Sequence, residues 1–334
     1  MPRQTKDERF ASHLPEILLY HSKILADGPR MTALKRSVEM YVREGRTFLD
    51  VGSGAGVWAI LAAKLGASRV VAVELEEGLI PVIFKHAQEN GVADRIEIIH
   101  GNIDNVQLNG KFDVIVAELF AGDVFSESTT SSMIGIRDRF LADGGVLLPQ
   151  LMQRWAAPVI KSIDGENDFD LPVTTSFLNG LLLNYGSQTS SFERSKLKFA
   201  AEPKLLTQID YLTVEVPPAA EMMLAEWTLD DVSKVDSVIV YCTTQYAPGV
   251  ILDTWKSDTW FGEKFEFTPF DVKAGTLRIE ANLDSNNPGW SISLPSHPDR
   301  VTQSFSPVFA YTRARMAFAA TPYKKARKSR KARS

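Results

Sequence analysis

Apolar and polar residues follow two alternating patterns through the first half of the chain. Four apolar runs are typical of buried strands, at residues 47–51, 70–74, 96–99 and 112–117. Three further segments have apolar positions at helical spacing, at residues 57–65, 79–90 and 133–141. Strands that alternate with helices in this way predict βαβ units, and therefore a parallel sheet with helices on both faces.

The parts of the chain on either side follow different patterns. Residues 12–46 have helical spacing, which the turn-forming Asp27-Gly-Pro29 interrupts. After Pro149 the chain contains mostly short strand-like runs, at residues 155–160, 211–216, 237–241, 264–267, 276–281 and 290–294. Many short strands with turn residues between them predict an antiparallel β-barrel or sandwich. Residues 165–200 fit this pattern less well, and we interpret them as an inserted arm.

Length and composition indicate two domains of ordinary globular type. The 334 residues exceed the roughly 250–300 at which a single hydrophobic core tends to divide. Hydrophobic residues make up 44% of the chain and charged residues 23%, which is usual for soluble proteins. No apolar run approaches the roughly 18–20 residues of a membrane span, and the N-terminus lacks the apolar core of a signal peptide. We therefore expect a cytoplasmic protein without a membrane partner.

A basic tail occupies residues 323–334. Seven positive charges fall within Lys324–Ser334, so residues 1–323 have a net charge of about −11, which is the chain's −4 less the tail's +7. A run of like charges without aromatic residues predicts disorder. Such a tail could contact nucleic acid or an acidic partner electrostatically, and it would suit a nuclear location in a eukaryote. A purely solubilising role is the alternative.

Three successive strand ends contain residues suited to a nucleotide-like ligand. The first strand reaches Asp50 and continues into Gly52-Ser-Gly54-Ala-Gly56, where glycine lets the backbone turn tightly and approach a ligand closely. The second ends at Glu74, where a carboxylate can accept hydrogen bonds from both ribose hydroxyls. The third is followed by Ile103 and Asp104, where a carboxylate could accept the adenine amino group.

The glycine spacing favours one ligand over another. A dinucleotide loop has the order G-x-G-x-x-G, whereas this loop is G-x-G-x-G with Val57 next. Asp50 would also face a pyrophosphate with negative charge, but it suits a cationic amino group such as that of S-adenosylmethionine. We therefore favour S-adenosylmethionine over NAD as the cofactor. The alternative is a tight strand–helix turn with solvated acidic strand ends, above all at Asp104. No pattern predicts a metal site.

Glu118 and Glu127 bracket the loop that follows the apolar run at 112–117. Ligands of open α/β sheets bind at the carboxyl ends of the strands. Two carboxylates at such a place suit a planar cation with several N–H donors, such as a guanidinium. Because this group stays protonated, it is a poor nucleophile. Orientation and electrostatic preorganisation would then supply most of the rate gain in methyl transfer.

Several of these segments together resemble the protein arginine N-methyltransferase family, over roughly residues 18–310. Glu118-Leu-Phe-Ala-Gly-Asp-Val-Phe-Ser-Glu127 is similar to the family's double-glutamate loop, and its Glu-Leu-Phe opening is closest to the monomethylating type III branch. Phe48–Gly56 and Val73-Glu74 match the family's cofactor motifs. The resemblance implies an α/β Rossmann-like S-adenosylmethionine methyltransferase domain at 47–149, followed by an antiparallel β-barrel or sandwich substrate domain at 150–322.

The same resemblance implies roles for other residues. Ile24-Leu-Ala-Asp-Gly-Pro-Arg30 is similar to the segment whose arginine binds the cofactor carboxylate, so Arg30 would be a cofactor ligand. Residues 1–46 would form a helical lid over the cofactor, with Tyr20 at the substrate pocket. The arm at about 165–200 would form a homodimer. Trp255 would line the substrate pocket, although Thr254 stands where the family has a histidine that supports it.

The leading hypothesis is an S-adenosylmethionine-dependent N-methyltransferase that acts on arginine in a protein or peptide, with Glu118 and Glu127 as its catalytic residues. Thr254 and the altered glutamate loop leave two alternatives. One is a methyltransferase for a small guanidine or amine metabolite. The other is a catalytically weak scaffold that binds partners through the old site and the basic tail.

Overall fold

The chain forms two compact units. The structure is a computed structural model that describes residues 6–119, 127–160, 197–217, 223–254, 257, 259, 263–267, 269–282, 289–300 and 303–305. The first unit contains Met1–Ala156, Pro203–Met222 and Val240–Gly262, and the second contains Ala157–Glu202, Met223–Ile239 and Glu263–Ser334. The chain therefore returns to the first unit twice. Most of the expected arm at 165–200, and the whole tail at 323–334, lie outside the described residues.

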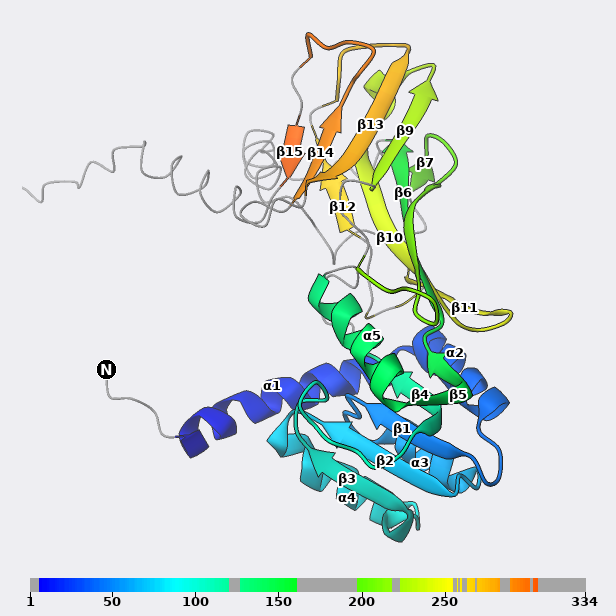
Figure 1. Ribbon diagram of the computed structural model, residues 1–334. Helices are drawn as coiled ribbons and strands as arrows, with labels where there is room; N and C mark the ends of the chain where they lie inside the picture. The colour runs from blue at the N-terminus through cyan, green and yellow to red at the C-terminus, as the bar shows by residue number, and fades with distance from the viewer. Residues whose placement is uncertain are drawn as a thin grey trace, which may run out of the picture. The chain divides into compact units, whose positions relative to one another are not determined.

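A five-stranded parallel sheet forms the centre of the first unit (Figure 1), and four of its strands are those that the sequence predicts. Its strand order is β3-β2-β1-β4-β5. The strands are β1 (Thr47–Val51), β2 (Arg69–Glu74), β3 (Ile96–His100), β4 (Phe112–Ala117) and β5 (Leu141–Leu148). Strand order reverses between β1 and β4, and such a reversal opens a crevice beyond the carboxyl ends of the strands. The site residues expected at Asp50 and Glu118 flank this point.

Helices cover both faces of this sheet. Helix α3 (Val57–Lys64) packs against β1 and β2, and α4 (Ile80–Glu89) packs against β3. Helix α5 (Glu127–Phe140) contacts β5 and lies on the other side of the sheet from α3 and α4 (Figure 1). Right-handed crossovers require this arrangement, because β1 leads to β2 in one direction and β4 leads to β5 in the other. Two 3₁₀ turns, Glu77–Leu79 and Ala93–Arg95, precede α4 and β3.

Two helices precede the sheet and meet at Asp27. These are α1 (Lys6–Ala26) and α2 (Gly28–Tyr41). Asp27 is the N-cap of α2, because its Oδ1 atom accepts a hydrogen bond from the backbone N–H of Arg30 at 3.2 Å. Pro29 occupies the first turn, where a missing N–H has no cost. The predicted break is therefore confirmed, and it places Arg30 in the first turn of α2.

The other strands of the first unit, outside the parallel sheet, form antiparallel pairs. Strand β6 (Leu151–Ile160) pairs with β8 (Lys204–Asp210) through Leu151–Ala156. Strand β10 (Val235–Ala247) pairs with β11 (Val250–Asp253). The register of the second pair shifts between Gln245 and Ala247, which makes Tyr246 a bulge residue. Tyr246 is fully buried.

The second unit is also built from antiparallel strands. One four-stranded sheet has the order β15-β14-β13-β9. Its strands are β9 (Leu224–Leu229), β13 (Gly275–Asn282), β14 (Gly289–Ser293) and β15 (Gln303–Phe305). The end of β6 pairs with β7 (Lys198–Phe199), and β12 (Glu263–Glu266) pairs with β10. A 3₁₀ turn at Val232–Lys234 leads into β10. The expected parallel-sheet domain followed by antiparallel β structure is confirmed.

The strand expected at residues 211–216 is wrong. Those residues form a turn, and the strand β8 ends before them at Asp210. The Asp210 carboxylate accepts a hydrogen bond from the N–H of Leu212 at 2.9 Å, and an aspartate that bonds the backbone two residues on favours a turn. Arg137 of α5 donates to the carbonyls of Tyr211 and Val214 at 3.1 and 2.6 Å. These carbonyls are therefore satisfied without a neighbouring strand.

The apolar pattern also missed β5. Leu141–Leu148 contains Asp143, Gly144 and Gly145, which predict a turn rather than a strand. Gly144 has φ of 68°, a conformation that glycine adopts readily, and the register with β4 shifts between Phe112 and Val114. Pairing with β4 thus overrides the local preference. Helix α5 likewise begins at Glu127, six residues before the predicted start at Met133.

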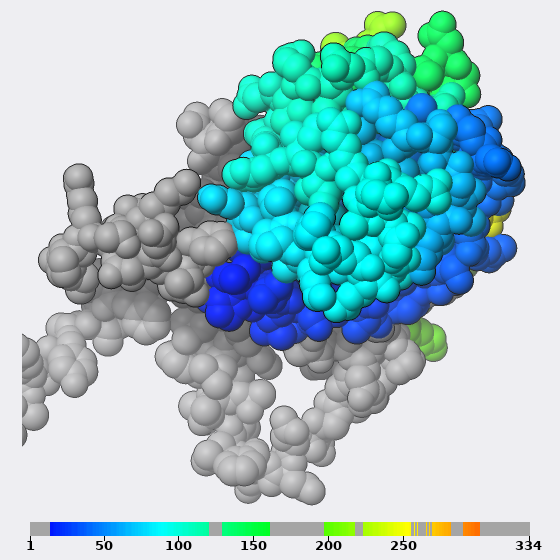
Figure 2. Space-filling model, turned by 90° about the horizontal axis from the view of Figure 1, so that it is seen from below, coloured from blue at the N-terminus to red at the C-terminus, as the bar shows by residue number. Residues whose placement is uncertain are grey.

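The described helices contain no segment long and apolar enough to cross a membrane. Figure 2 shows the first unit from below, where the cyan segment around α4 and β3 forms one continuous surface and the dark blue segment of α1 lies at its edge. Phe84 of α4 is about half exposed. Single exposed apolar side chains of this kind are usual on soluble surfaces.

Candidate active site

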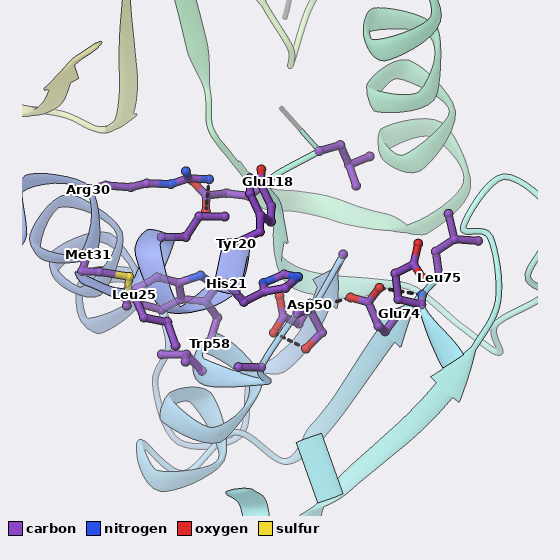
Figure 3. Close-up of a pocket in the computed structure, with 18 residues that line it drawn as sticks. Tyr20, His21, Leu25, Arg30, Met31, Asp50, Trp58, Glu74, Leu75 and Glu118 are labelled. Carbon is purple, nitrogen blue, oxygen red and sulfur yellow. Dashed lines mark hydrogen bonds and ion pairs between the residues drawn. The ribbon is translucent and has the colours of Figure 1, made fainter. Parts of the chain in front are cut away.

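A cavity of about 280 Å³ lies at the carboxyl ends of β1, β2 and β4 (Figure 3). Seven of the residues predicted from the sequence line it: Tyr20, Arg30, Asp50, Gly52, Gly54, Glu74 and Glu118. Ile103 and Asp104 are not among the lining residues. Trp255 and the side chain of Glu127 lie outside the described part of the chain, although Glu127 begins α5. The cavity therefore brings together segments from three strand ends and both N-terminal helices.

The glycine loop between β1 and α3 forms one wall of the cavity. Gly52 and Gly54 have φ of 68° and 57°, a region that other residues rarely adopt. A Cβ atom on Gly54 would lie 2.7 Å from Cε1 of His21, so a side chain there would collide with the imidazole. Glycine is needed at this position both for the turn and for the approach of His21.

Glu74 fixes this loop to the end of β2. The carboxylate is buried, and its Oε2 atom accepts a hydrogen bond from the N–H of Gly54 at 2.7 Å. Its Oε1 atom accepts a second from the N–H of Glu76 at 2.8 Å. Glu74 therefore shapes the glycine loop as well as lining the cavity, and each carboxylate oxygen retains capacity for a further donor.

Asp50 is a buried acid with only local partners. Its Oδ2 atom accepts hydrogen bonds from the Ser53 hydroxyl at 2.8 Å and from the N–H of Ala59 at 3.0 Å. Burial raises the pKa of Asp50 to about 7, although these two hydrogen bonds oppose the rise. Near neutral pH the side chain is thus divided between its neutral and charged forms, and a cation bound beside it would favour the charged form.

Arg30 and Glu118 form a buried ion pair at the other side of the cavity (Figure 3). Arg30 Nη2 lies 3.1 Å from Glu118 Oε2, and Arg30 Nε donates to Glu118 Oε1 at 3.3 Å. Burial lowers the pKa of Arg30, but Glu118, Tyr246 and Tyr20 together outweigh burial and leave that pKa raised. The guanidinium and the carboxylate thus form a two-pronged ion pair.

Tyr246 completes the surroundings of Glu118. Its hydroxyl donates to Glu118 Oε1 at 2.8 Å. Burial raises the pKa of Tyr246 well above its usual value, and the neighbouring Glu118 raises it further, so the hydroxyl stays protonated. Tyr246 was not among the site residues predicted from the sequence. The local pattern of β10 gives no signal for it, because Glu118 lies 128 residues away in the chain.

His21 is a second residue that the sequence analysis left out of the site. Its ring lines the cavity and, in Figure 3, lies between the Arg30–Glu118 pair and the Asp50 and Glu74 carboxylates. Burial lowers the pKa of His21, partly offset by the charge of Glu74. Its ring meets the Tyr20 ring edge-on, with 5.5 Å between centroids. The adjacent positions of these two residues, late in α1, were the available sequence signal.

A network around Asp27 reaches Arg30 from a different side. Asp27 Oδ2 accepts hydrogen bonds from the Ser257 hydroxyl, from the Thr259 hydroxyl at 2.6 Å and from the Thr259 N–H at 3.0 Å. Thr259 Oγ1 in turn accepts one from Arg30 Nη1 at 3.4 Å. Burial raises the pKa of Asp27, but the hydrogen bonds from Ser257 and Thr259 outweigh burial and lower it. The ionised carboxylate thus links α2 to the segment after β11.

Thr254 has a structural role in the same segment. Its hydroxyl donates to the carbonyl of Cys242 at 2.9 Å and accepts a hydrogen bond from the N–H of Cys242 at 3.0 Å. The side chain is fully buried. Both hydrogen-bonding functions of this hydroxyl are directed to the backbone of β10, so Thr254 is not a replacement for a proton-handling histidine.

The loop after β3 is held by α5. Arg139 donates to the carbonyls of Ile103 and Asp104 at 2.9 and 3.0 Å, and also to the carbonyl of Val106. Ile103 is buried, whereas Asp104 is exposed and accepts a hydrogen bond from the Ser132 hydroxyl at 3.3 Å. An adenine-binding role for Asp104 stays a prediction.

The lining residues suit an amino-acid nucleoside such as S-adenosylmethionine. A guanidinium can bind a carboxylate, acidic strand ends can bind hydroxyl and amino groups, and the glycine backbone admits close approach. Arg30, Asp50, Glu74 and the loop from Gly52 to Gly54 provide these features on one cavity. In the described residues no cluster of His, Cys, Asp and Glu could hold a metal ion.

Comparison with known proteins relates the first unit to methyltransferases. A family model for ribosomal protein L11 methyltransferase (PrmA) matches residues 32–143. Protein arginine N-methyltransferase PRMT10 of Arabidopsis thaliana is 37% identical over 161 residues, which are 46% of this chain and 41% of that protein. Protein arginine N-methyltransferase 6 of Danio rerio is 28% identical over 55% of this chain and 56% of that protein. The matches thus span about half the length of these relatives.

Solved structures extend the likeness to most of the chain. The Trypanosoma brucei PRMT1 enzyme–prozyme heterotetramer with AdoHcy has a TM-score of 0.67 at 22% identity, covering 86% of this chain and 97% of that one. Arabidopsis thaliana protein arginine methyltransferase 10 has a TM-score of 0.66 at 20% identity, covering 87% and 99%. The chain therefore has the fold of the protein arginine methyltransferases and is related to them in sequence over about half of its length.

Proposed function

We propose that the protein is an S-adenosylmethionine-dependent methyltransferase that methylates the guanidinium of arginine in a protein or peptide. The observation that supports this most is Glu118, a largely buried carboxylate just beyond β4, held beside a glycine loop that suits the cofactor. Relatives that bear the name protein arginine N-methyltransferase, and a structural neighbour solved with AdoHcy, support the same reaction.

The residues of the chain would act by binding and orientation. The cofactor supplies an electrophilic methyl group on sulfur. Glu118 and Glu127 would bind the substrate guanidinium through charge-assisted hydrogen bonds and aim one nitrogen at that methyl group. A new N–C bond forms as the S–C bond breaks, and the methylated nitrogen releases one proton. Arg30 would bind the cofactor carboxylate while remaining paired with Glu118.

Several finer assignments belong to the same proposal. The Glu118-Leu-Phe opening supports monomethylation, as in the type III branch. Ile103 and Asp104 would contact the adenine, Tyr20 and Trp255 would line the substrate pocket, and residues 165–200 would join two copies in a homodimer. We expect a cytoplasmic protein, and contact with nucleic acid only through the tail at 323–334.

A methyl-transfer assay tests the proposal. The protein is incubated with tritiated S-adenosylmethionine and a panel of arginine-rich peptides, and the products are analysed by mass spectrometry. Glu118→Gln and Glu127→Gln should each lower kcat by at least about 100-fold, because each removes a charge that orients the guanidinium. Glu97→Gln, which changes an exposed glutamate of β3, is the matched control.

The outcomes distinguish the proposal from its rivals. Full activity in Glu127→Gln would contradict the assigned clamp. Label in small guanidines from a cell lysate, with none in protein, would favour a metabolite methyltransferase. Cofactor binding without turnover on any peptide would favour a scaffold.

A further inference from the structure

Tyr246 reaches Glu118 through an irregularity in β10. The register of β10 and β11 shifts between Gln245 and Ala247, so Tyr246 is the extra residue of a bulge. Bulges turn a side chain out of the regular alternation of a strand, and they are frequent beside active sites. Here the turned side chain is fully buried, and its hydroxyl lies 2.8 Å from Glu118 Oε1. The bulge thus directs one hydroxyl to one oxygen of the proposed clamp.

The contacts of Glu118 show what this hydroxyl leaves for a substrate. An ionised carboxylate has two oxygens with about four acceptor positions. Among the described residues, Oε1 accepts from Tyr246 and from Arg30 Nε, which uses both of its positions. Oε2 accepts from Arg30 Nη2. One acceptor position, on Oε2, then remains for an incoming N–H.

We propose that Tyr246 is a positioning residue, which fixes Glu118 so that Oε2 presents a single acceptor to the substrate guanidinium. This inference rests on the proposed function. Because the Tyr246 hydroxyl stays protonated, it donates to Oε1 at every working pH. Without this hydroxyl, the Glu118 carboxylate would have a second open acceptor position, on Oε1. It could then hold the guanidinium in more than one orientation. Only a single orientation aims the reacting nitrogen correctly.

Two tyrosine substitutions test this role. Tyr246→Phe removes the hydroxyl and keeps the ring. Tyr211→Phe is the matched control, because Tyr211 is equally buried but its hydroxyl has only a 3.5 Å contact with Met152 Sδ. We expect Tyr246→Phe to lower kcat for methyl transfer by roughly ten- to 100-fold, the range for a hydrogen bond to a charged group. Tyr211→Phe should leave kcat within about threefold of wild type.

A separate measurement shows whether the effect acts through Glu118 or through the cofactor. The Kd for S-adenosylmethionine, measured by calorimetry, should stay within about threefold of wild type in Tyr246→Phe, because Arg30 keeps its pair. An unchanged kcat, or a loss of cofactor affinity equal to the loss of kcat, would overturn the inference. If the Phe variant fails to fold, 3-fluorotyrosine at position 246 makes the hydroxyl more acidic and adds only a fluorine atom to the ring. A change in kcat is then expected, and an unchanged kcat overturns the inference.

The wild-type result separates the two proposals. No methyl transfer by the wild-type chain to any arginine peptide would contradict the proposed function and, with it, this role of Tyr246. An active wild type with an equally active Tyr246→Phe variant would contradict the role of Tyr246 alone.

Discussion

Two carboxylates at the same edge of the sheet, one buried and one largely buried, obtain their partners in different ways. Within the described part of the chain, Asp50 accepts hydrogen bonds only from Ser53 and Ala59, which follow it closely in sequence. Glu118 is held by Arg30, 88 residues away, and by Tyr246, 128 residues away. Neutral local donors do not offset the burial of Asp50, whereas the distant Arg30 brings Glu118 a full opposite charge. Residues close in sequence thus shape the cavity around Asp50, whereas a residue distant in sequence supplies the positive charge beside Glu118.

The largest expected effect comes from removing the distant partner. Arg30→Met should lower the free energy of unfolding by about 3–5 kcal/mol, because Glu118 is left buried and unpaired. Urea denaturation measures this change. Adding Glu118→Gln in the same chain should restore a large part of the loss. A double variant no more stable than Arg30→Met would show that the pair does not behave as a buried ion pair.

An intermediate effect is expected at the carboxylate with local partners. The pKa of Asp50 is raised from 3.8 to about 7 in the folded protein, so folding favours the neutral form. Its stabilisation is complete below pH 3.8 and is lost as the pH rises to about 7. The Asp50→Asn variant should not show this pH-dependent loss of stability, because asparagine does not ionise. The free energy of unfolding of the variant, relative to that of wild type, should therefore rise by about 2–4 kcal/mol across this pH window.

Urea denaturation at a series of pH values measures the Asp50 effect. Asp113→Asn is the control of opposite sign, because hydrogen bonds from Thr47 lower the pKa of Asp113. The Asp113 contribution is present above pH 3.8 and is lost only as the pH falls through the lowered pKa. A stability difference between Asp50→Asn and wild type that stays constant with pH would contradict the assignment.

The smallest effect is expected where an ion pair is exposed. Arg69 Nη2 and Glu97 Oε2 lie 3.4 Å apart, with side-chain exposures of 34% and 55%. Glu97→Gln should change the free energy of unfolding by less than about 0.5 kcal/mol, since water screens exposed pairs. The same urea experiment as for Arg30→Met gives the comparison. An equal loss in the two variants would mean that burial does not distinguish the pairs.

Much of the fold could be predicted from the sequence because local signals agree with it. The strand at Phe112–Ala117 and the start of α3 at Val57 occur where the apolar pattern places them. The break at Asp27 follows from capping chemistry that needs only four residues. The glycine loop was visible for the same reason, since its turn is set by Gly52, Gly54 and Gly56 themselves.

The partners of Glu118 could not be predicted in the same way. Tyr246 is one buried residue in an apolar strand, and only the bulge and the packing of β10 direct its hydroxyl to Glu118. The segment Tyr211–Val214 is a turn and not the predicted strand. Its carbonyls accept hydrogen bonds from Arg137 of α5, which the local apolar pattern does not show. In both cases a residue far away in the chain supplies a contact that the local pattern does not show, although the hydrogen bond from Leu212 to Asp210 is a local signal for the turn.

The last turn of helix α5 connects two segments that are far apart in the chain. Arg137 fastens it to the turn at Tyr211–Val214, and Arg139 fastens it to the loop from Ile103 to Val106. Both segments are thus hydrogen-bonded to the same helix and should move together with it. Glu127 is at the opposite, N-terminal end of α5. A displacement of α5 would therefore move Glu127 and the loop after β3 together.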